Sequence, residues 1–111
     1  MQTETNLIEE NKRGENHSFL YYLHEEGKFD SSSLTDLCQY LAKLETISLA
    51  QLKDLHFIQE QILKHLVWHF DSQDLYTISD LPSDYWEYLN HMELEMKKIC
   101  DRLELTLEVE N

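Results

Sequence analysis

Apolar residues recur along most of this chain at spacings of three and four, which is the period of an amphipathic helix. The longest such stretch spans residues 48–70, and Ser48 with Gln51 forms a capping-box pattern at its start. The periodicity therefore predicts a helix over 48–70 with one face in the core. That face holds Leu52, Leu55, Ile58, Ile62, Leu66 and Phe70, with Leu49, Leu63 and Val67 beside it.

Three further segments share this periodicity and predict helices over residues 18–26, 33–45 and about 83–103. Ser18 is a suitable N-cap for the first, and Gly27 occupies the place of a left-handed C-terminal residue. The apolar positions are Phe19, Leu20, Tyr22 and Leu23 in the first helix, Leu34, Leu37, Cys38, Leu41 and Leu44 in the second, and Tyr85 or Trp86, Leu89, Met92, Met96, Ile99 and Leu103 in the third.

The boundaries of these helices rest on local signals. Ser33 with Asp36 resembles a capping box, and Pro82 is suited to the first turn of the last helix. Residues 46–48 combine weak helix formers with a good cap, so we expect two helices on either side of them. One merged helix is the alternative, because neither Gly nor Pro separates the two.

The two ends of the chain carry weaker patterns. Residues 1–16 have few apolar positions and predict a mobile segment or a short frayed helix around 4–12, ending near Gly14. Residues 105–110 alternate apolar and polar side chains, which is compatible with a short edge strand. Because no partner strand is evident, an extended tail over 105–111 is the preferred interpretation.

Turn-forming residues are scarce in this chain. Its 111 residues include two glycines and one proline, whereas sandwiches and barrels need many tight turns. Four helices, each with one apolar stripe, predict a small all-α bundle of about four helices. The length allows a single domain, residues 1–111.

The chain is strongly acidic, with 22 acidic residues against nine basic ones and a formal net charge of −13. Such a chain is repelled by nucleic-acid phosphates and by anionic membranes, so we expect a basic protein as its partner, with no direct nucleic-acid or membrane contact. It lacks a signal-peptide pattern and an apolar run long enough for a membrane span. These features, with reduced core thiols at Cys38 and Cys100, predict a soluble cytosolic protein.

Just over half of the net negative charge, −7 of −13, comes from one window of the sequence. Between Lys64 and Lys97, 32 consecutive residues include no Lys or Arg and seven carboxylates. Aromatic side chains share this window, and rings beside unpaired acids are typical of a binding patch. The alternative is that the tryptophans anchor the core and the acids form a solvated face. The predicted partner-binding residues are Asp71, Asp74, Tyr76, Asp80, Asp84, Tyr85, Glu87 and Tyr88.

Histidines offer a weaker candidate site. His65 and His69 are four residues apart on one predicted helix, and Glu87 and His91 repeat that spacing on another, so the four are the candidate ligands of a two-helix metal site. Sequence alone does not show convergence, and both pairs fit a surface or core-edge position equally well. We therefore expect no metal and no other cofactor.

Catalytic and DNA-binding patterns are not evident. Cys38 and Cys100 lie on apolar faces, where a thiol stays protonated, and the serines at 31–33 form a capping cluster. A helix-turn-helix over residues 34–60 would present a near-neutral or negative recognition helix, whereas DNA binding needs a basic one. The expectation is that the chain is not an enzyme.

These observations favour a non-catalytic, acidic protein-binding domain. The leading hypothesis is an inhibitor or immunity-type protein that neutralises a basic, nuclease-like toxin by occluding its active site or nucleic-acid-binding surface. The alternatives are a phage-type nucleic-acid mimic, a helical secretion chaperone or adaptor, and a metal-binding bundle. The sequence does not fix the oligomeric state or the order in which the helices pack.

Overall fold

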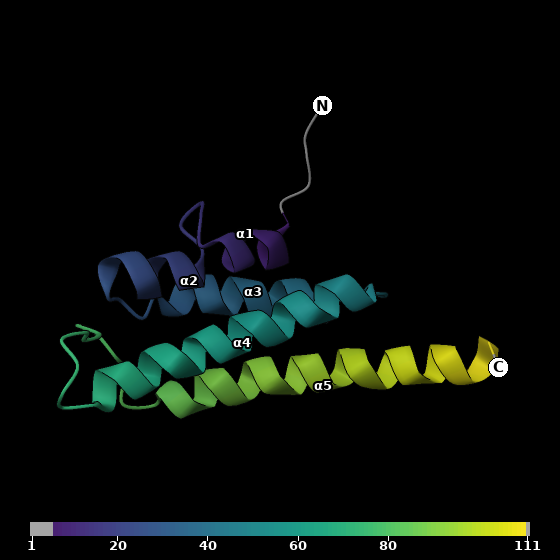
Figure 1. Ribbon diagram of the computed structural model, residues 1–111. Helices are drawn as coiled ribbons and strands as arrows, with labels where there is room; N and C mark the ends of the chain where they lie inside the picture. Colours follow the sequence, from purple (N-terminus) through teal and green to yellow (C-terminus); the bar gives the residue numbers. More distant parts are fainter. Residues whose placement is uncertain (1–5, 111) are drawn as a thin grey trace.

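The computed structural model describes residues 6–110, and the side chains of residues 6–102, as one helical bundle (Figure 1). No strand occurs between residues 6 and 110, so the prediction of a small all-α bundle is confirmed. In chain order the elements are α1 (Leu7–Arg13), α2 (Phe19–Tyr21), the π-helical turn η1 (Tyr22–Glu26), α3 (Ser31–Lys43), α4 (Leu49–Phe70) and α5 (Tyr85–Glu110).

The two longest helices, α4 and α5, have 22 and 26 residues. Figure 1 shows them running side by side and joined at one end by the loop over residues 71–84. The helix α1 lies against α4, and α3 lies against α5. Within the described part of the chain, no helix is both long and apolar enough to cross a membrane.

One continuous core lies between the helices of the bundle, and most of the predicted apolar positions are buried in it. The stripe of α3 is buried as predicted, whereas Phe70, at the end of the predicted α4 stripe, is exposed and leaves the core. The long helices contribute Leu55, Ile58, Ile62 and Leu66 from α4 and Met92, Met96 and Ile99 from α5.

The N-terminal helix is packed rather than frayed. Ile8 and Asn11 of α1 are buried, and the Asn11 side chain accepts a hydrogen bond from the Leu20 N–H at 3.1 Å. Gly14 ends the helix in the left-handed conformation, as predicted. The predicted short helix ending near Gly14 is therefore present, and Leu7 also packs against the core. Residues 1–5 lie outside the described part.

The helix boundaries agree with the sequence signals at α2 and α4 and differ at α3. Ser18 caps α2, and Ser48 forms the predicted capping box with Gln51, so α3 and α4 are separate helices. However, α3 begins at Ser31, because Asp30 rather than Ser33 is its N-cap and accepts a hydrogen bond from the Ser33 N–H. The negative charge of a carboxylate is also stabilised at the positive, N-terminal end of a helix dipole, which explains why Asp30 is the N-cap.

The C-terminal helix is longer than predicted. It begins at Tyr85 rather than near Pro82, and it continues to Glu110. The prediction of an extended tail or edge strand over 105–110 is therefore wrong, and Asn111 lies outside the described part. Adding residues to an existing helix costs far less free energy than nucleating a new one. The helix therefore continues through residues 105–110 although their apolar and polar side chains alternate.

Candidate partner-binding groove

The loop over residues 71–84 is fastened to the turn that follows η1. The Ser79 N–H donates a hydrogen bond to the Gly27 carbonyl at 2.8 Å, and the Asp80 carboxylate accepts one from the Phe29 N–H at 2.6 Å. These bonds join positions about fifty residues apart in sequence. The predicted binding residue Asp80 thus serves to hold the loop in place.

Two further contacts fix the middle of this loop. The Tyr76 hydroxyl donates a hydrogen bond to the Leu23 carbonyl, and its burial raises the pKa of Tyr76 to about 12. Ile78 is buried, and its N–H donates a hydrogen bond to Nδ1 of His69 at 2.8 Å. Tyr76 therefore turns toward the fold and is half-buried, and its role in partner binding stays a prediction.

The remaining loop carboxylates stabilise local turns. Asp71 accepts a hydrogen bond from the Gln73 N–H at 2.9 Å, and Asp74 accepts one from the Tyr76 N–H at 2.8 Å. This is the Asx-turn geometry for which aspartate is common in loops. Both side chains are exposed, so each contributes to the acidic surface as well as to the turn.

The predicted binding residues at the start of α5 have a different environment. Asp84, Glu87 and Tyr88 line a shallow hollow of about 290 Å³ together with Thr35 and His91. The Tyr88 ring is half-buried and packs on Phe29, with ring centroids 5.7 Å apart. Asp84 and Glu87 are exposed, and neither side chain makes a hydrogen bond or ion pair with another described residue. Their charges are therefore available to a partner.

A large exposed apolar surface lies between α4 and α5, beside this loop. We call it the α4–α5 groove, an open trough of about 660 Å³ lined by Leu63, Leu66, Val67, Phe70, Asp71, Tyr85 and Trp86. Four of these side chains, those of Leu63, Val67, Phe70 and Trp86, are 46% to 64% exposed. Clusters of large exposed apolar side chains are typical of interaction surfaces, because their hydration is unfavourable.

The groove continues along both helices. Leu63 and Trp86 also line a second hollow of about 240 Å³ that reaches Gln59 on α4 and Glu93 on α5. Ile62, Leu89 and Met92 form its apolar lining, with Asn90 at its edge. Taken together, the two hollows make one trough that follows the α4–α5 seam over three helical turns.

Aromatic rings order one wall of the groove. Tyr85 lies between its neighbours, with ring centroids 5.9 Å from Phe70 and 5.3 Å from Trp86. Ring contacts of this kind restrict side-chain rotation, so less conformational entropy is lost when a partner binds. The groove is therefore ordered before any partner arrives.

The rim of the groove carries negative charge. Asp71 lies at one end and Glu93 at the other, and residues 65–96 include no Lys or Arg. The apolar floor and the acidic rim thus come from the same sequence window. The expected combination of aromatics and acids is present, although its apolar part comes largely from α4 residues that the periodicity assigned to the core.

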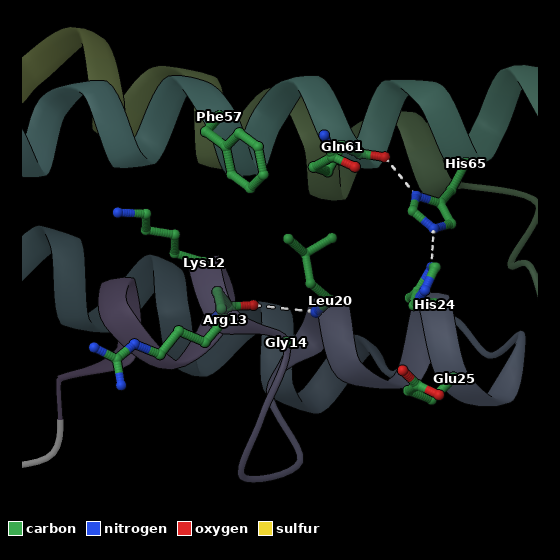
Figure 2. A pocket seen from close by; sticks show the side chains of 10 residues that line it. Lys12, Arg13, Gly14, Leu20, His24, Glu25, Phe57, Gln61 and His65 are labelled. Carbon is green, nitrogen blue, oxygen red and sulfur yellow. Dashed lines mark hydrogen bonds between the residues drawn. The ribbon is translucent and has the colours of Figure 1, made fainter.

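The histidines that the sequence offered as metal ligands point to different places. His65 is buried, and its Nδ1–H donates a hydrogen bond to the Gln61 carbonyl at 2.6 Å (Figure 2). Its Nε2 then accepts from Nδ1 of His24 at 3.1 Å, which joins α4 to η1. Burial, with smaller contributions from His24 and Lys64, lowers the pKa of His65 despite its bond to Gln61, which favours the charged form.

The other candidate ligands do not join this pair. His69 accepts the loop hydrogen bond described above, whereas Glu87 and His91 line the hollow at the start of α5. Nε2 of His91 lies 3.8 Å from the Glu95 carboxylate. Among the residues that the structure describes, no group of three His, Cys, Asp or Glu side chains is placed to hold a metal ion.

The two cysteines lie where the periodicity places them. Cys38 is buried in the core, and this burial, with the nearby Glu95, raises the pKa of its thiol to about 11. Cys100 is half-buried and also free. A thiol with so high a pKa is protonated at neutral pH and is a poor nucleophile.

No protein-family model, curated protein or solved structure matches this chain. The candidate site therefore rests on its geometry. The predicted binding residues include two that line the groove, Asp71 and Tyr85, and leave out Trp86. They also leave out Leu63, Val67 and Phe70. A signal was present, since these three recur at i, i+4 and i+7 and form a second apolar stripe beside the buried one.

Proposed function

We propose that this chain is a non-catalytic binding protein whose α4–α5 groove receives a basic protein. One observation carries the proposal: large apolar side chains are exposed in a groove whose lining includes the carboxylates of Asp71 and Glu93 and no Lys or Arg. Exposed aromatic and aliphatic side chains supply the buried area of an interface, and the carboxylates select a partner of positive charge.

The role that best combines these properties is that of a cytosolic inhibitor or immunity-type protein. Its carboxylates would replace nucleic-acid phosphates on a basic, nuclease-like toxin, and its bulk would cover the active site or nucleic-acid-binding surface. A formal net charge of −13 supports rapid association with such a partner through long-range attraction. A pure nucleic-acid mimic is less well supported, because charge mimicry does not need an exposed apolar groove.

The test compares capture of a partner from an extract of the native cells by three forms of the full chain. The first is the wild type, and the second carries Val67→Asn and Phe70→Asn in the groove. The third carries Leu49→Asn and Leu75→Asn, which alter two side chains that are 66% and 100% exposed outside the groove. We expect the first and third forms to retain the same basic protein and the groove variant to lose it.

The kinetics of the captured pair test the charge component. The association rate should fall steeply when NaCl is raised from about 50 to 500 mM, because salt screens attraction between exposed charges. An inhibitor should also abolish the toxic or nuclease activity of the partner at equimolar concentration. A partner that is acidic, or that binds the groove variant as well as the wild type, would contradict the proposal.

The second candidate is a helical secretion chaperone or adaptor, which the exposed apolar groove also favours. Such a protein holds an unfolded or extended client and commonly works as a dimer. Light scattering of the purified chain and of its complex separates the two roles. An inhibitor gives a stoichiometric complex with a folded, active partner, whereas a chaperone complex contains a client that lacks its native activity.

A further inference from the structure

We infer that the α4–α5 groove receives an amphipathic helix of the partner, about three turns long, with Lys or Arg on both sides of its apolar stripe. This inference rests on the proposed function, since it specifies which part of a basic protein occupies the groove. It follows from the length of the groove, from the backbone groups of α4 and α5 being already hydrogen-bonded, and from the acidic residues at its ends.

The dimensions of the groove fit a short helix. Its lining on α4 extends from Gln59 to Phe70, which corresponds to roughly 17 Å at the rise of an α-helix. Leu63, Val67 and Phe70 occupy positions i, i+4 and i+7, and Trp86 faces the same trough from α5. A partner helix with apolar residues at i, i+3 or i+4, and i+7 presents a complementary stripe.

The walls of the groove are helical, and they offer no sheet edge to which a strand could add. The backbone N–H and C=O groups inside α4 and α5 already pair within each helix. Gln59 and Asn90, at one end, are the amides that line the trough. A helix satisfies its own backbone hydrogen bonds, whereas an extended peptide would depend on water or on these two side chains, so the groove favours a helix.

The charge around the groove selects a cationic helix. Asp71 and Glu93 lie at its two ends, and Asp84 and Glu87 are exposed at the adjoining start of α5. The same charge disfavours a second copy of this chain, because the formal net charge of −13 on each copy would bring two acidic rims together. Lysines or arginines flanking an apolar stripe are the chemistry that this rim complements.

The chain carries its own reporter for the experiment. Trp86 is exposed in the groove, whereas Trp68 is half-buried against His65 and Tyr76. In a Trp68→Phe background, tryptophan fluorescence reports on Trp86 alone. A helix that covers Trp86 should shift its emission to shorter wavelength.

The probes are three synthetic peptides of about 14 residues, long enough for four helical turns. The first carries leucines at helical spacing flanked by lysines, the second replaces the lysines with glutamates, and the third is a scramble of the first that destroys the apolar stripe. We expect the first peptide to bind and to shift Trp86 emission. The second and third should bind at least about tenfold more weakly, because each lacks one of the two required features.

Two variants test the apolar contact and the charge contact separately. The pair Val67→Asn and Phe70→Asn should weaken binding of the lysine peptide at least about tenfold, while Leu49→Asn with Leu75→Asn leaves it unchanged. Glu93→Lys should weaken the lysine peptide and strengthen the glutamate peptide. Equal binding of the scrambled peptide would overturn the inference in favour of charge alone, and equal binding of the glutamate peptide would overturn the charge requirement.

The remaining outcomes separate this inference from the proposed function. If no peptide binds but partner capture still requires Val67 and Phe70, the groove binds a folded surface and the helix inference is wrong while the proposed function stands. If partner capture does not require these residues, the proposed site itself is wrong. A concentration-dependent dimer that the groove variant abolishes would identify a second copy as the occupant and overturn the inference.

Discussion

The loop over residues 71–84 and the neighbouring α4–α5 groove share one acidic, aromatic stretch of sequence. Side chains of the loop point toward the fold, whereas side chains of the groove point toward solvent. In the loop, Tyr76 and Asp80 turn toward η1 and the turn that follows it, and they hold backbone groups there. In the groove, Val67 and Trp86 face solvent. The difference shows that acidic and aromatic content alone does not tell which side chains hold the fold and which form an exposed surface.

The largest effect is expected where the loop meets Gly27. This glycine has a φ of +61°, and a Cβ added to it would lie 2.8 Å from the Thr77 carbonyl oxygen. Gly27→Ala should lower the free energy of unfolding by roughly 2–3 kcal/mol, since left-handed strain adds to a backbone clash. Gly14→Ala is the matched control, with a φ of +63° and nothing within 4 Å, and should cost about 1 kcal/mol. Urea denaturation of both variants measures the difference. Equal losses in the free energy of unfolding would show that the Thr77 carbonyl does not approach Gly27 closely.

The next effect concerns Asp80. Asp80→Ala leaves the Phe29 N–H without its acceptor and should lower the free energy of unfolding by about 1–2 kcal/mol. Asp80→Asn keeps an oxygen acceptor and should cost less. Glu93→Gln, which removes an exposed charge from the groove rim, should change stability by less than about 0.5 kcal/mol. If Asp80→Ala is as mild as Glu93→Gln in denaturant melts, the loop carboxylate is not structural.

Acid should weaken the contact between α4 and η1. Because burial lowers the pKa of His65 in the folded state, the unfolded chain binds a proton more readily. The stability that His65 contributes is complete above the unfolded pKa of about 6.5 and is lost as the pH falls from there through the lower folded pKa. Denaturation at pH values from about 7.5 to 5 should show this slope in the wild type and a shallower one in His65→Asn. Identical slopes would contradict a buried neutral His65.

The smallest effect on stability is expected in the groove. Val67→Asn with Phe70→Asn replaces exposed apolar side chains, so the free energy of unfolding should change by less than about 1 kcal/mol. The same pair should abolish partner binding. Denaturant melts and circular dichroism check the first statement, and a large loss of stability would mean that these side chains belong to the core after all.

Most of the helical framework could be predicted from the sequence, because helix formation depends on local periodicity and on capping residues. The helices α2 with η1, α3 and α4 lie close to the predicted ranges, and Ser18 and Ser48 cap two of them. The differences are the starts of α3 and α5 and the C-terminal end of α5. At that end, cooperative extension of the helix overcomes a weak local pattern.

The candidate site was only partly predictable. Tyr85 and the exposed acids at the start of α5 could be named, because charge and residue type are visible in the sequence. The loop-holding contacts of Tyr76 and Asp80 could not be predicted, because their partners lie about fifty residues away along the chain. Phe70 was assigned to the core face, with Leu63 and Val67 beside it, since periodicity shows which residues share a face but not whether another helix covers it.

The sequence by itself determined that this chain is helical and acidic, and that just over half of its net negative charge, −7 of −13, lies between Lys64 and Lys97. These properties follow from residue identity and spacing, which need no tertiary contact. The tertiary structure alone decided which acidic and aromatic side chains hold the loop and which remain exposed. That division depends on how closely α4 and α5 approach and on where the loop over residues 71–84 folds back against Gly27, and both are set by contacts between residues far apart in the chain.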